Sequence, residues 1–269
     1  IHYQNALGAD KVTSVDALIL AMGRFSGFQM EQLNLQRLPN RALRYEAGIR
    51  FEVKSTNVFF TKQRETDVKL KWSRELVSHR TFCTCRDGEV CWLAVDGISA
   101  ISGRADGDTT GYSNFGLLTR FEGDTSAGAL WYEDVIRLSR QLGGAIWQPA
   151  LEILGHPGPI DIDTSDRPWH PKPQFKRADF GSILGSTILQ PIENALKELL
   201  IHFPELATQD AICIFPAIES SQRYLVTNEQ LRVPNEEIWV AGDQAGNFRG
   251  LIPALVSGYF CGMMASAQQ

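Results

Sequence analysis

The most informative segment of the chain for its fold runs from Glu237 to Gly258 and reads EIWVAGDQAGNFRGLIPALVSG. Its apolar residues Ile238 to Ala241 form a short run bounded by turn residues, which predicts a central strand covered on both faces. Gly242 lets the backbone come close to a ligand, and Asp243 then lies at the carboxyl end of the strand, where open α/β sheets bind ligands. A carboxylate at this point can accept hydrogen bonds from a sugar-like polyol.

The second half of the stretch predicts a helix whose N-terminus faces the same ligand. Gly246 and Gly250 loosen the turn, and Pro253 fits the first turn of a helix that we expect to run to about Ala265. The free backbone N–H groups of that first turn point at whatever fills the crevice, and they favour negative charge there.

This stretch resembles the last FAD contact of FAD-dependent oxidoreductases of the glutathione-reductase type, in which a strand ends in Gly-Asp or Gly-Glu before such a helix. The run VDALILAMGR at 15–24 looks like the second FAD-contacting strand of those enzymes. The resemblance implies that FAD is the cofactor and that the helix N-terminus stabilises the N1–C2=O edge of the reduced flavin. It implies cofactor contacts from both turns, by Ala21, Gly23, Arg24, Gly242, Asp243, Gly246, Arg249, Gly250 and Leu251.

Three further motifs occur in the order seen in a family known only as FAD-utilising dehydrogenases: GIRFE at 48–52, HRTFCTCRDGEV at 79–90 and YSN at 112–114. The resemblance covers roughly residues 15–265. Two positions depart from the family pattern. Arg86 stands where the family usually has Pro, and Asp243-Gln244 stands in place of Glu-Gly. Asp for Glu keeps the carboxylate, so we expect the FAD contact to be kept, whereas Arg86 leaves the role of the neighbouring cysteines open.

The family also begins with a βαβ unit carrying Gly-x-Gly-x-x-Gly, whose helix N-terminus holds the pyrophosphate of FAD. The glycines at 23–27 and 242–250 have the wrong spacing for this motif, and the chain starts at Ile1. We therefore expect the C-terminal part of a larger flavoprotein, completed by a missing N-terminal part or by a partner chain. The alternative is a complete protein that dispensed with the nucleotide half.

The pattern along the chain predicts an α/β protein with an insertion. Residues 1–45 and 226–269 are expected to form a Rossmann-like, three-layer FAD-binding domain, and residues 46–225 a β-rich α+β substrate domain. Strands are predicted at 17–21, 48–53, 81–85, 90–95, 116–121, 212–218 and 223–226, with a hairpin turn at 86–88. Helices are predicted at 28–33, 131–142 and 190–203, and a surface loop at 155–173.

Composition excludes several function classes. The chain has 269 residues, 43% of them hydrophobic, and its net charge of −5 offers no basic footprint for nucleic acid. No run reaches the ~18 to 20 apolar residues of a membrane helix, and no secretory signal heads the chain. Five cysteines in a chain of this length do not form a disulfide framework. We therefore expect a cytoplasmic protein that binds neither nucleic acid nor membranes.

Two residues are candidates for catalysis. His79 can act as an acid–base group because its ordinary pKa lies near neutrality, or it is simply a satisfied polar side chain. Arg249 either lies beside the flavin ring or pairs with an acid at the surface. Arg80, Arg104 and Arg223 are further candidates for holding an anionic substrate.

The pair Cys83 and Cys85 is the sharpest local motif. A closed zinc site needs four ligands, and no second Cys pair or nearby His pair exists, so no metal site is predicted. On a strand, side chains at i and i+2 share one face, which leaves three roles open: a redox dithiol, a substrate pocket or plain packing. Glu219 resembles a family position near the flavin, and the remaining polar candidates read as turn residues: Asp106, Asp108 and Asn114.

The function predicted from these observations is that of a flavin-dependent oxidoreductase. A hydride would pass between FAD and an unknown small-molecule substrate, with the protein supplying orientation and electrostatics. The alternatives are one subunit of a split flavoprotein, and a noncatalytic binding protein that keeps the fold.

Overall fold

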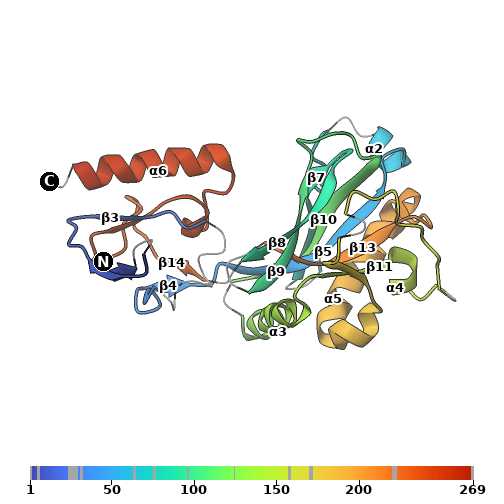
Figure 1. Ribbon diagram of the computed structural model, residues 1–269, viewed down its shortest axis with the longest axis horizontal. Coiled ribbons are helices and arrows are strands. Elements are labelled where there is room, and N and C mark those ends of the chain that lie inside the picture. The colour runs from blue at the N-terminus through green and yellow to red at the C-terminus, as the bar shows by residue number, and fades with distance from the viewer. Residues whose placement is uncertain are drawn as a thin grey trace. The chain divides into compact units, whose positions relative to one another are not determined.

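The computed structural model shows a mixed α/β protein that divides into two compact units (Figure 1). It describes residues 2–4, 7–23, 30, 33–62, 65–74, 77–95, 97–123, 125–156, 159–169, 172–219 and 223–267. Unit 1 comprises Ile1–Leu43 and Ser221–Gln269, and unit 2 comprises Arg44–Ser220. The predicted boundaries after residues 45 and 225 lie within a few residues of this division.

A seven-stranded mixed sheet forms the body of unit 2. Its order is β12-β11-β13-β5-β10-β7-β6, in which β11 and β12 are parallel and the other neighbours antiparallel. The longest pairing joins β5 to β10 from Arg44 opposite Glu122 to Lys54 opposite Tyr112. The strands are β5 (Arg44–Lys54), β6 (Lys71–Arg74), β7 (Val77–Cys85), β10 (Tyr112–Glu122), β11 (Ala145–Pro149), β12 (Phe175–Arg177) and β13 (Ile212–Ile218).

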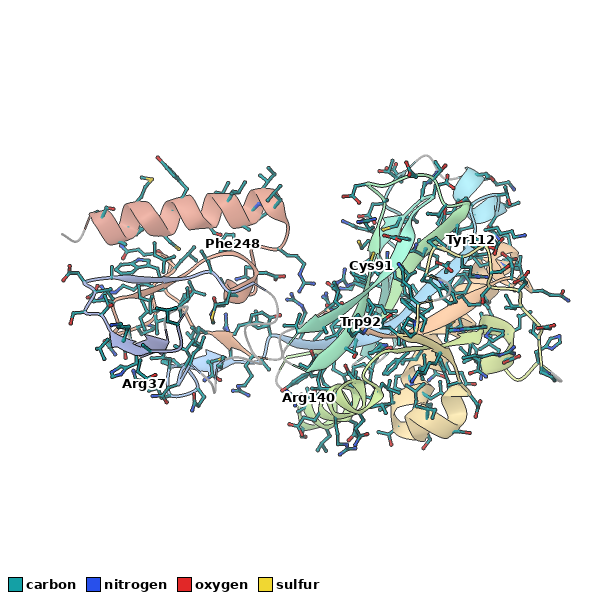
Figure 2. The ribbon with its side chains drawn as sticks, viewed as in Figure 1. Arg37, Cys91, Trp92, Tyr112, Arg140 and Phe248 are labelled. Carbon is teal, nitrogen blue, oxygen red and sulfur yellow. The ribbon has the colours of Figure 1, made fainter. Side chains whose placement is uncertain are left out.

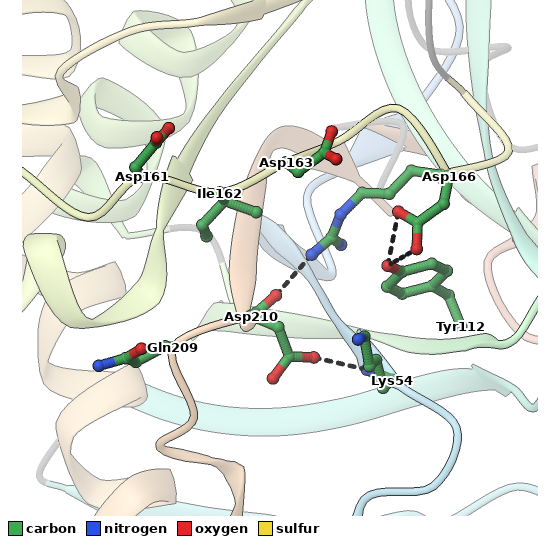
Figure 3. A pocket seen from close by; sticks show the side chains of 9 residues that line it. Lys54, Tyr112, Asp161, Ile162, Asp163, Asp166, Gln209 and Asp210 are labelled. Carbon is green, nitrogen blue, oxygen red and sulfur yellow. Dashed lines mark hydrogen bonds between the residues drawn. The ribbon is translucent and has the colours of Figure 1, made fainter.

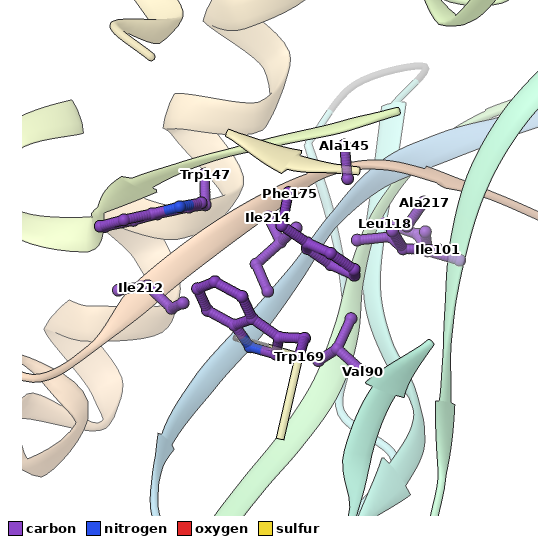
Figure 4. Packing of buried hydrophobic residues seen from close by; sticks show 10 residues of the cluster. All are labelled: Val90, Ile101, Leu118, Ala145, Trp147, Trp169, Phe175, Ile212, Ile214 and Ala217. Atoms are coloured by element: carbon purple, nitrogen blue, oxygen red, sulfur yellow. The ribbon is translucent and has the colours of Figure 1, made fainter. Parts of the chain in front are cut away.

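Both faces of this sheet are covered. Thr119 of β10 donates a hydrogen bond to the carbonyl of Pro191 in helix α5 (Phe180–His202), so this face of the sheet packs against that helix. Neighbouring Leu118 points the other way, because side chains alternate along a strand. It joins a buried apolar cluster with residues of the hairpin β8 (Glu89–Val95) and β9 (Ile98–Arg104) (Figure 4). Trp169 fills this cluster and stacks on Phe175, with ring centroids 5.1 Å apart.

The helices of unit 2 begin and end at residues suited to those places. In α3 (Ser126–Leu142) the Thr125 hydroxyl accepts a hydrogen bond from Gly128 N, and Gly143 in a left-handed conformation ends the helix. Asp179 caps α5 (Phe180–His202) in the same way, through Ser182 N. The shorter helices are α2 (Val58–Lys62), α4 (Ala150–Ile153) and η1 (Pro204–Leu206).

Unit 1 is built from short strand pairs and one long helix. Strands β3 (Leu18–Leu20) and β15 (Ile238–Val240) pair in parallel. Two other pairs are antiparallel, β1 (His2–Gln4) with β2 (Asp10–Val12) and β4 (Asn40–Arg41) with β14 (Tyr224–Leu225). The turn η2 (Gly242–Ala245) and helix α6 (Leu251–Ser266) follow β15.

Most predicted elements are confirmed, including the unit 1 strands at 18–20 and 238–240, the helix ending at Leu142 and the strand 212–218. Strands β9 and β11 were not predicted. The predicted helix at 28–33 falls largely outside the described residues. The three-layer Rossmann-like arrangement of unit 1 stays a prediction.

Three expectations about unit 2 were wrong. The turn at 86–88 does not close a hairpin, because β8 pairs with β9 while β7 pairs with β10. Helix α5 begins at Phe180 rather than near residue 190, because Asp179 caps a first short segment there. A kink at Gly185, with φ 67° and ψ 168°, separates this segment from the helix that continues to His202. The segment 155–173 is not wholly a surface loop, because Arg167 and Trp169 are buried. Both side chains donate hydrogen bonds to Oε1 of Glu52, at 2.5 and 2.9 Å.

Candidate functional site

The two glycine turns of unit 1 lie side by side. Because β3 and β15 are parallel, their carboxyl ends meet at the same edge. The ladder continues beyond the strands, as Ala241 N donates to the Leu20 carbonyl at 2.9 Å. One step further, Met22 N donates to Gln244 Oε1 at 3.0 Å. Ala21 and Gly23 therefore adjoin η2, whereas a ligand shared by the two turns stays a prediction. Arg24, the last residue predicted for this turn, lies outside the described residues.

Glycine is required by the backbone at three points of the C-terminal turn. Gly242, Gly246 and Gly250 have φ of 69°, 81° and 100°, a region that other residues rarely adopt. Gly246 also has no room for a side chain, since a Cβ there would lie 2.4 Å from Cδ1 of Leu43. The turn is held to the helix behind it by Gly242 N, which donates to the Ser257 hydroxyl at 2.8 Å.

The N-terminus of α6 begins at this turn without a side-chain cap. Its N-cap residue is Gly250, which has no side chain to accept the first N–H groups, and Pro253 contributes no N–H of its own. Leu251 at the first position is 75% exposed. The first backbone N–H groups of α6 are therefore available to a negatively polarised ligand group.

Asp243 forms an ion pair with Arg249. The Nε of Arg249 lies 3.3 and 3.2 Å from the two carboxylate oxygens, and the side chains are 16% and 30% exposed respectively. Of the two roles predicted for Arg249, pairing with an acid is the one observed. The partial exposure of Asp243 leaves its carboxylate able to accept further hydrogen bonds.

A buried donor without a partner lies in the same turn. Gln244 is 2% exposed and its Oε1 holds Met22, but its Nε2 has no hydrogen-bond partner among the described residues. Buried polar groups are normally satisfied, and each exception calls for an explanation such as a ligand or water. A cavity of about 360 Å³ adjoins the turn and is lined in part by Ala245, Asn247 and Phe248, the last labelled in Figure 2.

His79 belongs to unit 2, not to the unit that holds the glycine turns. It is 3% exposed, its Nδ1 lies 3.3 Å from the Thr119 hydroxyl, and its ring centroid lies 5.8 Å from that of Trp72. Burial lowers the pKa of His79, and the charge of Glu198 only partly opposes this. These are the surroundings of a neutral, packed histidine, so its catalytic role stays a prediction.

The other polar candidates have partners within the protein. Arg80 binds Glu46 at 2.5 Å, Arg104 binds Glu89 at 2.6 Å, and Arg223 donates to the side chain of Asn40 at 2.5 Å. Glu219 is buried, with its backbone N–H donating to the Glu46 carbonyl. Asn114 is not the turn residue expected, because it is buried within β10.

Sequence reasoning missed a second cavity, of about 320 Å³, in unit 2 (Figure 3). At its wall the Tyr112 hydroxyl lies 2.8 Å from both carboxylate oxygens of Asp166, and Arg167 donates to the Asp210 carbonyl at 2.5 Å. Burial, followed by the hydrogen bond to Asp166, raises the pKa of Tyr112. Its lining comes from segments far apart in the chain, so no local motif could have revealed it.

The described residues contain no cluster of His, Cys, Asp or Glu side chains that could hold a metal ion. Within the same ranges, every helix is too short or too polar to cross a membrane. Comparison with protein-family models and with curated proteins found no match to the chain.

Proposed function

We propose that the protein is a flavin-dependent oxidoreductase whose FAD binds at the two glycine turns of unit 1. The observation that carries the proposal is their juxtaposition: both turns follow parallel strands, and an uncapped helix N-terminus begins at the same place. This combination at the carboxyl edge of parallel strands is typical of nucleotide-cofactor sites. The sequence resemblance supplies the identity of the cofactor.

The residues around the turns fit a flavin. Asp243 would accept hydrogen bonds from the ribityl hydroxyls, since it remains partly exposed beside Arg249. The first N–H groups of α6 would stabilise the negative N1–C2=O edge of the reduced ring. The unpartnered Nε2 of Gln244 is a donor for a ring or ribityl oxygen. When bound, the flavin supplies hydride transfer at N5 to or from a small-molecule substrate.

A second version of this proposal includes a further chain segment. The outer side of α6 is apolar and exposed, and parallel strands such as β3 and β15 normally have both faces covered. The occupant that fits is a βαβ unit carrying Gly-x-Gly-x-x-Gly, which would complete a Rossmann-like domain and bind the pyrophosphate of FAD. The exposed side chains are Leu251, Ile252, Leu255, Val256, Tyr259 and Met263.

Flavin titration tests both versions. We expect the fluorescence of FMN and of FAD to be quenched when either flavin binds the 269-residue chain. The dissociation constants should lie above ~1 μM, because the helix N-terminus that would bind the pyrophosphate of FAD is not supplied. Asp243→Ala should weaken binding by about 10- to 100-fold, the value of one hydrogen bond to a charged group. Asp16→Ala, an exposed carboxylate of the same unit, is the matched control.

Three results would count against the proposal. An unchanged affinity in Asp243→Ala, or no saturable quenching by FMN, contradicts the ring-side site. A submicromolar affinity for FAD contradicts the version that needs a further segment.

A further inference from the structure

The pair Cys83 and Cys85 lies at a β-bulge in unit 2. Cys85 faces Asn114 and Phe82 faces Gly116, so Cys83 and Thr84 share one position on the partner strand β10. Cys83 has a φ of 47°, a left-handed conformation that costs free energy in a residue other than glycine. Such bulges re-aim side chains and are frequent beside active sites.

The bulge suits the pair to disulfide formation. In a regular strand, residues i and i+2 are separated by ~6.6 Å, near the upper limit of ~6.8 Å between the Cα atoms of bridged cysteines. An extra residue that bends the strand shortens this span. The Cys85 thiol already donates to the Cys83 carbonyl, with Sγ and O 3.5 Å apart.

A buried guanidinium adjoins the two cysteines. Arg50 of β5 is fully buried, and its Nη2 donates to the Cys83 carbonyl at 2.6 Å and lies 3.3 Å from Sγ of Cys85. Its Nε donates to Oδ1 of Asn114 at 2.5 Å, and the amide of Asn114 donates in turn to the Gly88 carbonyl at 3.2 Å.

Arg50 has no carboxylate partner at ion-pair distance among the described residues. Its Nη1 has no hydrogen-bond partner there either, although the side chain is fully buried. A buried cation is costly unless a negative group offsets it. The charge of Arg50 acts on the buried carboxylate of Glu52, and a thiolate of the neighbouring cysteines would add a second negative group beside it.

The two thiols differ in acidity. The hydrogen bond from Cys85 lowers the pKa of Cys83 to about 6 against the effect of burial. The charge of Arg50 adds to the lowering, and the charge of Asp67 opposes it. The same hydrogen bond and burial raise the pKa of Cys85. Cys83 is therefore the more acidic of the two thiols, and it is also the less buried one. By contrast, burial raises the pKa of Cys91 and of Cys213.

We propose that Cys83 and Cys85 form a thiol–disulfide exchange site for low-molecular-weight disulfides, with the buried guanidinium of Arg50 beside the pair. The half-buried Cys83 thiolate attacks one sulfur of R–S–S–R, forms Cys83–S–S–R and releases one thiolate RS⁻. Cys85 gives up its proton to solvent and attacks the Cys83 sulfur, which closes the Cys83–Cys85 disulfide and releases a second RS⁻. The protein loses two electrons and the small disulfide gains them. The site lies within unit 2 and does not depend on flavin binding.

Oxidised glutathione is the probe for this reaction. After incubation with the full chain, trypsin cleavage at Arg80 and Arg86 releases one peptide, 81–86, which contains both cysteines. We expect this peptide to carry an internal disulfide. Cys85→Ser should instead accumulate glutathione on Cys83, and Cys83→Ser should show neither product. Cys91→Ser, which removes a half-buried single thiol, is the matched control and should leave the reaction unchanged.

The pH profile of alkylation by iodoacetamide gives a second readout. The rate at Cys83 should rise with a midpoint near the pKa of about 6 rather than near ~8.5, the value of an ordinary cysteine. Arg50→Met should move the midpoint upward. If Arg50→Met does not fold, the alkylation profile of the wild-type chain and the glutathione products of the cysteine variants still test the proposal. A wild-type midpoint near ~8.5, or glutathione attached equally to Cys91, would overturn the proposal.

Discussion

The two units stabilise themselves in different ways. Unit 2 covers both faces of a seven-stranded sheet and buries ion pairs in its interior. Glu46 is buried beside Arg44, Arg80 and Arg120, and Glu52 is buried beside Arg167. Unit 1 has a two-stranded parallel sheet and a helix with only Ser257 and Cys261 buried. Unit 2 therefore covers its core with its own residues. Unit 1, by contrast, leaves apolar side chains and the first backbone N–H groups of α6 exposed.

The largest expected effect comes from breaking the buried ion pair of unit 2. Glu52→Gln leaves Arg167 as an uncompensated charge with 0% side-chain exposure. We expect the free energy of unfolding to fall by ~3–5 kcal/mol. Urea denaturation followed by tryptophan fluorescence measures this, because five of the six tryptophans lie in unit 2.

The matched control for this variant is Asp134→Asn, which breaks an exposed ion pair with Arg137. It should cost at most ~1 kcal/mol. Equal losses in the two variants would contradict the closed, low-dielectric interior that distinguishes unit 2.

The next effect concerns the small core of unit 1. Trp239 is fully buried against Ala241 and Cys261, so Trp239→Ala should lower the stability of this unit by ~3–5 kcal/mol. The remaining tryptophans then report on unit 2 alone. We expect their fluorescence midpoint to stay unchanged while circular dichroism shows an earlier transition. A joint shift of both signals would show that the two units unfold together.

The stability of unit 2 should depend on pH through the buried carboxylate of Glu46. Burial opposes the charged form of Glu46, but the hydrogen bond and charge of Arg80, with the charges of Arg120 and Arg44, lower its pKa below 4.5. This carboxylate therefore contributes stability that is fully present above pH ~4.5 and is lost as the pH falls through the lowered pKa.

Glu46→Gln should flatten the acid dependence of the unit 2 transition, measured as the urea midpoint between pH 3 and pH 6, approximate limits set around an ordinary glutamate. Glu133→Gln, an exposed glutamate on α3, should keep the wild-type slope. The same slope in both variants would mean that Glu46 is not held as a buried carboxylate.

The smallest effect is expected on the outer side of α6. Leu255 and Val256 are 61% and 60% exposed, so Leu255→Lys and Val256→Lys should change stability by less than ~0.5 kcal/mol. Cys261→Lys, on the buried side of the same helix, should be strongly destabilising. Thermal melts at several protein concentrations measure both. A large loss in Val256→Lys would show that a second copy of the chain covers this side in solution.

Much of unit 1 was predictable because its signals are local. The strand 238–240, the turn at Gly242 and the helix that follows are set by neighbouring residues: an apolar run, glycines with positive φ, and proline in a first helical turn. The family resemblance implied that Ala21 and Gly23 lie near the C-terminal turn. The structure gives the reason, because the carboxyl ends of the parallel strands β3 and β15 meet at one edge.

The features that could not be predicted depend on contacts between segments far apart in the chain. The sequence predicted that Cys83 and Cys85 share a strand, but the bulge and the approach of Arg50 arise from pairing with β10 and β5. Part of the polar segment 155–173 is buried because Arg167 and Trp169 donate hydrogen bonds to Glu52, which lies more than a hundred positions earlier in the chain. Local propensity carries no information about such partners, since the free energy of a buried charge depends on what the fold brings beside it.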